Sequence, residues 1–264
     1  MNIKKLAAVG LLAAAAAMTL AGCGGEKSAD ALPDKIVIGL DDNFPPMGFR
    51  DENGEIVGFD IDLAKEAGKR MGIPVEFKPI DWDSKEAALK SKQVDMLWNG
   101  LTITEDRAKQ IAYSKPYLDN AQILVVRADS PIADRAGLAG KVIGTQEGSS
   151  SIDALENQTE FKNSLQDVKR YGDFVAAFMD LELGRIDGIL VDSVVGRYYM
   201  SKKPGQFKVI DDKMGDEQYG IGMRKEDKML QDKLNETLKQ MSADGTMAKI
   251  SQKWFGEDIT VKVE

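Results

Sequence analysis

Five short polar stretches in this sequence each follow a run of apolar, β-forming residues. They begin at Asp41, Trp82, Gly100, Gln146 and Asp192. In an open α/β sheet, ligands bind beyond the carboxyl ends of the strands. We therefore expect these stretches to converge on one crevice, and their side chains to determine what it binds.

Arg107 occupies a position that helix formation alone does not favour. Thr104 is a plausible N-cap for a helix that continues with Glu105 and Asp106, so Arg107 falls in the first turn, where a cation opposes the helix dipole. The guanidinium could hold an anion together with backbone N–H groups near Thr102. The alternative is a surface ion pair with Glu105, Asp106 or another acid.

Ser149 and Ser150 follow a glycine and precede another helical segment. Their hydroxyl and N–H groups could contact a second side of an anion, or one serine could simply cap the helix. Asp192 closes the apolar run 188–191, and its carboxylate could pair with an ammonium group or cap the segment after it. A guanidinium, N–H groups and one carboxylate together complement a zwitterion.

Two aromatic residues and one acid belong to the same set of stretches. Phe44 and Trp82 could form walls around the aliphatic part of a ligand, although aromatic side chains more often pack in a core. Asp41 would make the far end of the pocket acidic unless it only caps a turn.

The composition excludes several classes of function. The 264 residues include no histidine and one cysteine, so no Ser-His-Asp or Cys-His arrangement and no His or Cys ligands for zinc are available. The net charge of −8 argues against nucleic acid, whose phosphates need a basic surface. We expect no metal and no other cofactor, while carboxylate chemistry remains open.

The N-terminus predicts export and lipidation. Lys4 and Lys5 precede an uncharged stretch over 6–20, which is typical of a secretory signal and short for a transmembrane span. The residues up to Cys23 resemble the lipobox of bacterial lipoproteins, and Cys23 would carry the lipid, unless it is an incidental cysteine after an ordinary signal. We predict a signal peptide over 1–22 and a lipidated tether over 23–34.

From residue 35 onward, strand-like and helical segments alternate. Strand-like runs cover 35–40, 75–80, 94–98, 122–126, 141–145, 188–191 and 209–210, and helical runs cover 60–71, 84–91, 152–156, 174–183 and most of 225–255. This alternation predicts an α/β fold with parallel sheets built from βαβ units. Asp60 is expected to cap the helix over 60–71.

The segment 58–71, which begins Gly58-Phe59-Asp60, resembles the signature of the family 3 solute-binding proteins of amino-acid ABC importers. The similarity extends over 35–256, including Asp95 and the segment from Tyr219. It implies a two-lobed periplasmic-binding-protein type II (Venus-flytrap) fold with two hinge strands that closes around its ligand. Lobe 1 would comprise 35–119 and 220–264, and lobe 2 would comprise 120–219.

The resemblance also implies roles for individual residues. The residues that would hold the ligand carboxylate are Arg107, Thr102, Ser149 and Ser150. Those that would hold the ligand ammonium are Asp192 and Gly100. The side-chain pocket would be formed by Asp41, Phe44, Trp82, Asn99 and Gln146.

Some positions differ from the histidine-binding and lysine/arginine/ornithine-binding relatives. Asn99 and Gly100 replace a pair of serines, Gln146 replaces an apolar residue, and Met47 replaces an aromatic one. Glutamine, cystine and other polar amino acids therefore stay open as ligands beside the basic ones.

The resemblance implies a monomeric binding protein without turnover, lipid-anchored outside the cytoplasm, that delivers a free polar L-amino acid to a separate membrane permease. An enzyme is the main alternative, because the same two-lobed fold resembles that of periplasmic cyclohexadienyl dehydratases. In such an enzyme Glu147 or Asp41 would be the general acid. An amino-acid sensor is a third alternative.

Overall fold

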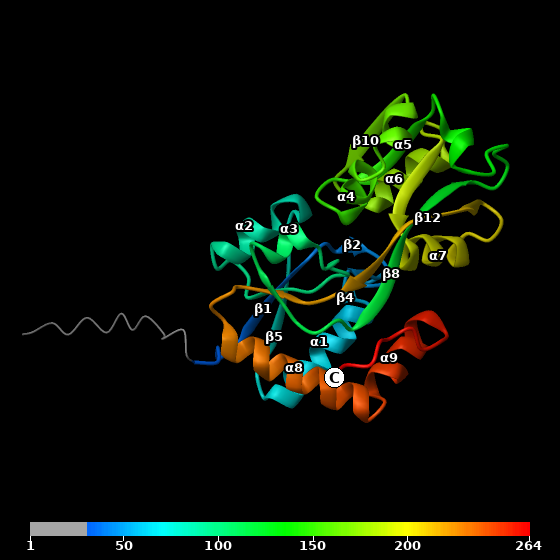
Figure 1. Cartoon of the computed structure of the whole chain (residues 1–264). Helices are drawn as coiled ribbons and strands as arrows, with labels where there is room; N and C mark the ends of the chain where they lie inside the picture. The colour runs from blue at the N-terminus through cyan, green and yellow to red at the C-terminus, as the bar shows by residue number, and fades with distance from the viewer. Residues whose placement is uncertain (1–30) are drawn as a thin grey trace, which may run out of the picture.

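The computed structural model describes residues 31–264, and for residues 211–213 only the backbone. The predicted signal peptide over 1–22 and the predicted lipidation at Cys23 lie outside the described residues. From residue 31 the chain forms two lobes, which two long strands connect (Figure 1). No helix within the described residues is long and apolar enough to cross a membrane.

The first lobe contains a five-stranded sheet in the order β5-β1-β6-β13-β7. Its strands are β1 (Ile36–Leu40), β5 (Val75–Pro79), β6 (Met96–Leu97), β7 (Ala112–Tyr113) and β13 (Gly222–Met223). Helices of this lobe are α1 (Phe59–Met71), α2 (Lys85–Lys90), α3 (Glu105–Ala108), α8 (Lys228–Ala243) and α9 (Thr246–Phe255). β1 pairs in parallel with β5 and β6, whereas β13 is antiparallel to both of its neighbours.

The second lobe contains a five-stranded sheet in the order β10-β9-β11-β8-β12. Its strands are β8 (Leu118–Arg127), β9 (Val142–Gln146), β10 (Asp167–Tyr171), β11 (Gly188–Asp192) and β12 (Phe207–Tyr219). Its helices are α4 (Ser150–Glu156), α5 (Thr159–Ser164), α6 (Phe174–Glu182) and α7 (Ser193–Lys202). The predicted α/β alternation is confirmed. The sheets are mixed rather than wholly parallel as predicted, because β13 in the first sheet and β8 in the second run antiparallel to both of their neighbours.

Smaller elements complete the fold. A three-stranded sheet consists of β2 (Asn43–Phe44), β3 (Gly48–Arg50) and β4 (Ile56–Val57). Two 3-10 turns are η1 (Trp82–Ser84) and η2 (Arg135–Leu138).

β8 and β12 connect the lobes. They pair antiparallel from Leu118 opposite Tyr219 to Arg127 opposite Phe207, with register shifts between Ile210 and Asp216. Their ends at Leu118 and Tyr219 extend from the second sheet toward the first lobe (Figure 1). A single bridge between Thr102 and Tyr219 joins this pair to the loop after β6.

The N-terminus of α1 differs from the sequence-based expectation. Gly58 is the N-cap, and Asp60 lies inside the first turn with no exposed surface, so the expected cap by Asp60 is wrong. The Asp60 carboxylate instead accepts hydrogen bonds from the Gly100 N–H at 2.7 Å and the Tyr117 hydroxyl at 3.0 Å. Asp60 therefore does not cap its own helix but holds the loop at Gly100, which is distant in the sequence.

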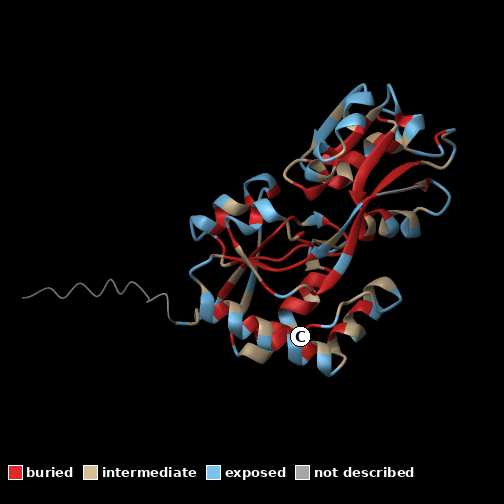
Figure 2. Cartoon of the chain, in the orientation of Figure 1, coloured by how far each residue is buried: buried red, intermediate tan, exposed pale blue. Residues whose placement is uncertain are grey.

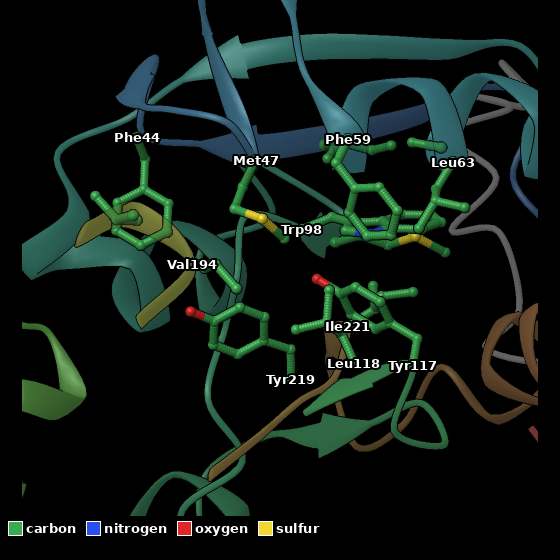
Figure 3. Close-up of a cluster of buried hydrophobic side chains, with 14 of the residues drawn as sticks. Phe44, Met47, Phe59, Leu63, Trp98, Tyr117, Leu118, Val194, Tyr219 and Ile221 are labelled. Carbon is green, nitrogen blue, oxygen red and sulfur yellow. The ribbon is translucent and has the colours of Figure 1, made fainter. Parts of the chain in front are cut away.

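The largest hydrophobic cluster extends across the junction between the lobes. Figure 3 shows Tyr117 and Tyr219, from the connecting segments, among side chains of the first lobe. The Tyr117 ring lies 6.3 Å from Phe59 and 6.4 Å from both Trp98 and Tyr219. Buried segments therefore continue from one lobe along the connecting strands into the other, as Figure 2 also shows.

The C-terminal helical segment buries one stripe. The predicted helix is two helices, α8 and α9, separated at Asp244 and by Gly245 in the left-handed conformation. Residues of α8 that face the core are Leu230, Leu234, Leu238 and Met241. Burying this stripe against α1 and α9 contributes more to helix stability than the propensity of an isolated helix.

We predict that Leu234→Ala lowers the free energy of unfolding by about 2–5 kcal/mol, because it leaves a cavity under a fully buried side chain. Urea denaturation followed by circular dichroism measures the change. The control is Met229→Ala on the same helix, where the side chain is 45% exposed and the expected change is about 0.5 kcal/mol or less. Equal effects of the two substitutions would contradict this packing.

Candidate functional site

Loops from both sheets meet at the junction of the lobes. The first lobe supplies the segments after β1 and β6 and the turn η1, and the second lobe supplies the β9–α4 loop and the end of β11. Hydrogen bonds between Thr102 and Ser150, between Gln146 and Asp41, and from Arg107 to Gly148 join the two groups. The five predicted stretches therefore do lie together in the structure.

Arg107 is buried at this junction. Its backbone N–H is capped by the Thr104 hydroxyl, as predicted, and the residue as a whole is 8% exposed. The guanidinium donates to the Thr102 carbonyl at 3.0 Å and to the Gly148 carbonyl at 2.9 Å. Asp106 pairs with Lys109 instead, at 2.6 Å. Arg107 Nε also lies 3.7 Å from Glu86 Oε1 of α2, so Arg107 contacts both lobes and has an acidic neighbour on α2 rather than on its own helix.

Asp192 ends β11 and is also almost fully buried. It holds the N-cap position of α7, but its side chain makes no capping hydrogen bond. Its Oδ1 accepts hydrogen bonds from Asn120 Nδ2 at 2.6 Å, Gln122 Nε2 at 3.1 Å and the Tyr219 hydroxyl at 2.6 Å. Burial, followed by the nearby charge of Glu217, raises the pKa of Asp192 to about 7.

Ser149 and Ser150 begin α4 from the second lobe. Ser149 is at the N-cap position but makes no side-chain cap, because its hydroxyl donates to the Gln146 carbonyl at 2.7 Å. The Ser150 hydroxyl lies 3.0 Å from the Thr102 hydroxyl of the first lobe. Of the two serines, Ser150 is the one whose side chain contacts the opposite lobe.

Asp41, Asn99 and Gln146 form a buried polar cluster. Gln146 Nε2 donates to Asp41 Oδ2 at 2.6 Å across the junction, and Asn99 Nδ2 donates to the Asp41 carbonyl at 3.2 Å. Asn99 Oδ1 and Gln146 Oε1 are buried without a hydrogen-bond partner. Burial is the main cause that raises the pKa of Asp41 to about 6. The cluster therefore has unused acceptor capacity.

The two predicted aromatic walls lie in different hydrophobic clusters. Phe44 packs against Phe174 of the second lobe with ring centroids 5.9 Å apart. Trp82 belongs to a smaller cluster of the first lobe, and the Lys85 ammonium lies 5.3 Å from its ring centroid. Whether the two rings enclose a ligand stays a prediction.

Gly100 is held where a larger residue would not fit. Its φ is +58°, a region that L-residues with a side chain rarely adopt. A Cβ atom there would lie 2.8 Å from the Phe44 ring and 3.2 Å from the Tyr219 ring. The Gly100 N–H donates to Asp60, so the loop is fixed by a buried carboxylate.

Lys85 is a residue of this junction that sequence reasoning missed. It is 2% exposed, and its ammonium donates to the Trp82 carbonyl at 3.1 Å and to the Gly148 carbonyl at 2.8 Å. Burial, followed by the charge of Arg107, lowers the pKa of Lys85 to about 8. The Gly148 carbonyl thus receives two cationic donors. The sequence around Lys85 is that of an exposed helix start and gave no signal of this contact.

Asn120, Gln122 and Glu217 were also missed, and all three lie on the connecting strands. Glu217 Oε2 accepts hydrogen bonds from both amides at 3.0 Å. A signal for Gln122 existed in the sequence, since it is the one polar residue of the otherwise apolar run 122–126. Glu217 stands in a polar stretch, where nothing distinguishes it from solvent-exposed acids.

The family follows from comparison with known proteins. The family model of bacterial extracellular solute-binding proteins, family 3, matches residues 36–257. The chain therefore belongs to this family, and the predicted two-lobed fold and the prediction of a binding protein rather than an enzyme are confirmed. Members of the family act outside the cytoplasm.

Individual relatives are similar over most of their length. The L-cystine-binding protein of Escherichia coli (strain K12) is 31% identical over 227 residues, which is 85% of this chain and 84% of that protein. The ABC transporter arginine-binding protein 1 of the same organism is 35% identical over 227 residues, covering 84% and 91%. The structure of an ABC uptake transporter substrate-binding protein from Streptococcus pneumoniae with bound histidine has a TM-score of 0.83 and 39% identity, covering 87% and 95%.

We predict that Asp60→Asn changes how stability depends on pH. Burial raises the pKa of Asp60 from 3.8 to about 7. The folded protein therefore keeps this proton over a range in which the unfolded chain has lost it, so its contribution is complete below pH 4 and is lost as the pH rises to about 7. Relative to wild type, the variant should gain on the order of 3 kcal/mol between pH 4 and pH 7. Urea denaturation at several pH values measures this difference, and parallel pH curves for the two proteins would contradict it.

Proposed function

We propose that this protein binds a free polar L-amino acid between its lobes and delivers it to an ABC permease in the membrane. The observation that carries the proposal is one continuous network between two buried, oppositely charged groups. It runs from Arg107 through Thr102 and Ser150 to Gln122 and Asp192. A zwitterion complements such a network because it brings both opposite charges on one small molecule.

The charges divide the proposed site into two ends. At one end Arg107, Thr102, Ser149 and Ser150 would hold the ligand α-carboxylate. At the other end Asp192 would receive the α-ammonium. The Gly100 carbonyl would assist Asp192 by accepting a hydrogen bond from the ligand ammonium, whereas the Gly100 N–H donates to Asp60.

The side-chain pocket favours a ligand rich in hydrogen-bond donors. The proposed lining residues are Asp41, Phe44, Trp82, Asn99 and Gln146. Buried polar atoms in proteins are normally paired, and two acceptors here, on Asn99 and Gln146, have no partner. The guanidinium of L-arginine would supply several donors next to the Asp41 carboxylate. Relatives named for arginine, histidine and cystine make these three the first amino acids to test.

The location and assembly belong to the same proposal. We infer that Cys23 carries a lipid that anchors the mature chain to the cell envelope after a signal peptide over 1–22 is removed, with 23–34 as tether. We take lobe 1 as 35–119 and 220–264 and lobe 2 as 120–219, which the strand ends at Leu118 and Tyr219 support. The protein would act as a monomer, since a cleft between two lobes of one chain needs no second copy.

We predict that Arg107→Ala weakens binding of the amino acid about a hundredfold or more, because it leaves the ligand carboxylate without its cation. Isothermal titration calorimetry with L-arginine, L-histidine and L-cystine measures the affinity. Arg197→Ala is the matched control, since Arg197 is exposed on α7. Arg107→Lys keeps the charge but loses the planar fork, and should bind more weakly than wild type. A loss below threefold in a folded Arg107→Ala protein would reject the carboxylate role.

We predict that Asp41→Asn changes selectivity rather than general affinity. Removing the carboxylate should weaken L-arginine at least about tenfold, and L-glutamine much less, because only the first brings a cation to this end of the pocket. Competition titrations give the ratio. Asp42→Asn is the control, as Asp42 pairs with Arg50 at the surface. An unchanged arginine-to-glutamine ratio would remove Asp41 from the specificity pocket.

A further inference from the structure

Glu217 lies on β12, where that strand runs between the lobes, and no predicted role includes it. A single carboxylate oxygen, Oε2, lies within hydrogen-bond distance of four donor atoms. The donors are Thr102 Oγ1, Asn120 Nδ2 and Gln122 Nε2, each at 3.0 Å, and Ser150 Oγ at 3.3 Å. All four donor residues are buried. Such a set of inward-pointing donors is a built site for one anionic oxygen.

The donors come from both sides of the cleft. Thr102 follows β6 in the first lobe, Ser150 begins α4 in the second lobe, and Asn120 and Gln122 lie on β8. The Glu217 carboxylate therefore contacts donors of both lobes. Two of its donors, Thr102 and Ser150, are those assigned above to the ligand carboxylate.

The donors on β8 are already fully used. An amide NH2 group carries two hydrogens, so Asn120 can give one to Asp192 and one to Glu217, whereas Gln122 must divide its two among Asp192, Glu217 and Ser150. A ligand carboxylate at the same hydroxyls would bring a further negative charge beside these two acids. Like charges at such short range repel strongly away from bulk water. The Glu217 carboxylate and a ligand carboxylate therefore exclude each other.

Glu217 has space into which it can withdraw. Glu217 is half-buried, and it lines two surface grooves of about 520 and 760 Å³. Rotation about its side-chain bonds would move the carboxylate from the donor cluster into water. The release would not require β12 to change its pairing with β8.

We propose that Glu217 is an internal competitor for the ligand carboxylate, which bridges the lobes in the empty protein and is displaced when the amino acid binds. This inference rests on the proposed carboxylate end of the site. It makes Glu217 a residue that sets affinity by stabilising the empty, closed form. Every ligand that carries a carboxylate pays the same displacement, so the effect is on affinity and not on the choice of side chain.

Glu217→Ala and Glu217→Gln test the proposal, with Glu105→Gln as the matched control. Glu105 is exposed on α3 and lines the same groove, so its substitution removes the same charge without touching the donors. Calorimetry with L-arginine, L-histidine and L-cystine should show binding about fivefold or more tighter in Glu217→Ala, a smaller gain in Glu217→Gln, and no change in the control. Thermal unfolding verifies that each variant is folded.

A ligand without a carboxylate supplies the second readout. L-argininamide keeps the α-ammonium and the guanidinium, and its neutral amide oxygen can accept from the same donors without bringing a second negative charge beside Glu217. The gain seen with L-arginine in Glu217→Ala should therefore be smaller with L-argininamide. Weaker binding of L-arginine in Glu217→Ala would overturn the proposal and place Glu217 with Asp192 at the ammonium end.

The empty protein supplies a third readout that does not need a ligand. Small-angle X-ray scattering should give a larger radius of gyration for ligand-free Glu217→Ala than for wild type and the control. An unchanged radius would overturn the bridging role. If wild type binds no polar L-amino acid, L-glutamine included, the proposed function fails. If wild type binds and the Glu217 variants bind equally well, only the role of Glu217 fails.

Discussion

Two opposite charges are buried in one cleft without being paired to each other, and the rest of this structure is arranged to tolerate them. A charge removed from water is destabilising by several kcal/mol unless nearby groups replace its solvation. Arg107 obtains this from the carbonyls of Thr102 and Gly148, and Asp192 from two amides and a tyrosine hydroxyl. The fold must therefore deliver polar groups from both lobes to one place.

The backbone makes this delivery possible at two glycines. Gly100 and Gly148 both adopt positive φ angles. A Cβ atom on Gly148 would lie 2.7 Å from the Asp83 backbone of the opposite lobe, so only glycine lets the loop come close enough for its carbonyl to meet Arg107 and Lys85. The β9–α4 loop thus needs glycine at position 148 in order to bring its carbonyl to the two cationic side chains.

The connecting strands contribute to the site as well as to its motion. Asn120, Gln122, Glu217 and Tyr219 all surround Asp192, and all lie on β8 or β12. Opening of the lobes about these strands would separate Thr102 from Ser150 and Asp41 from Gln146. The hydrogen bonds that define the junction are therefore also those that form when the lobes close. Binding of a ligand in the cleft is in this way coupled to closure of the lobes.

The sequence by itself determined the alternation of strands and helices, the buried stripe of α8, and the set of polar stretches that follow strands. These follow from local periodicity and from the rule that strand ends share one edge, so Arg107, Asp192 and Asp41 could be found without coordinates. The positions of Asp60, Lys85 and Glu217 were decided only by the tertiary structure. Each looks like an ordinary surface charge in its own segment, and each has a partner that lies between 40 and 115 residues away in the chain. No local pattern encodes such a contact, because the free energy of a charged side chain depends on what packing places around it.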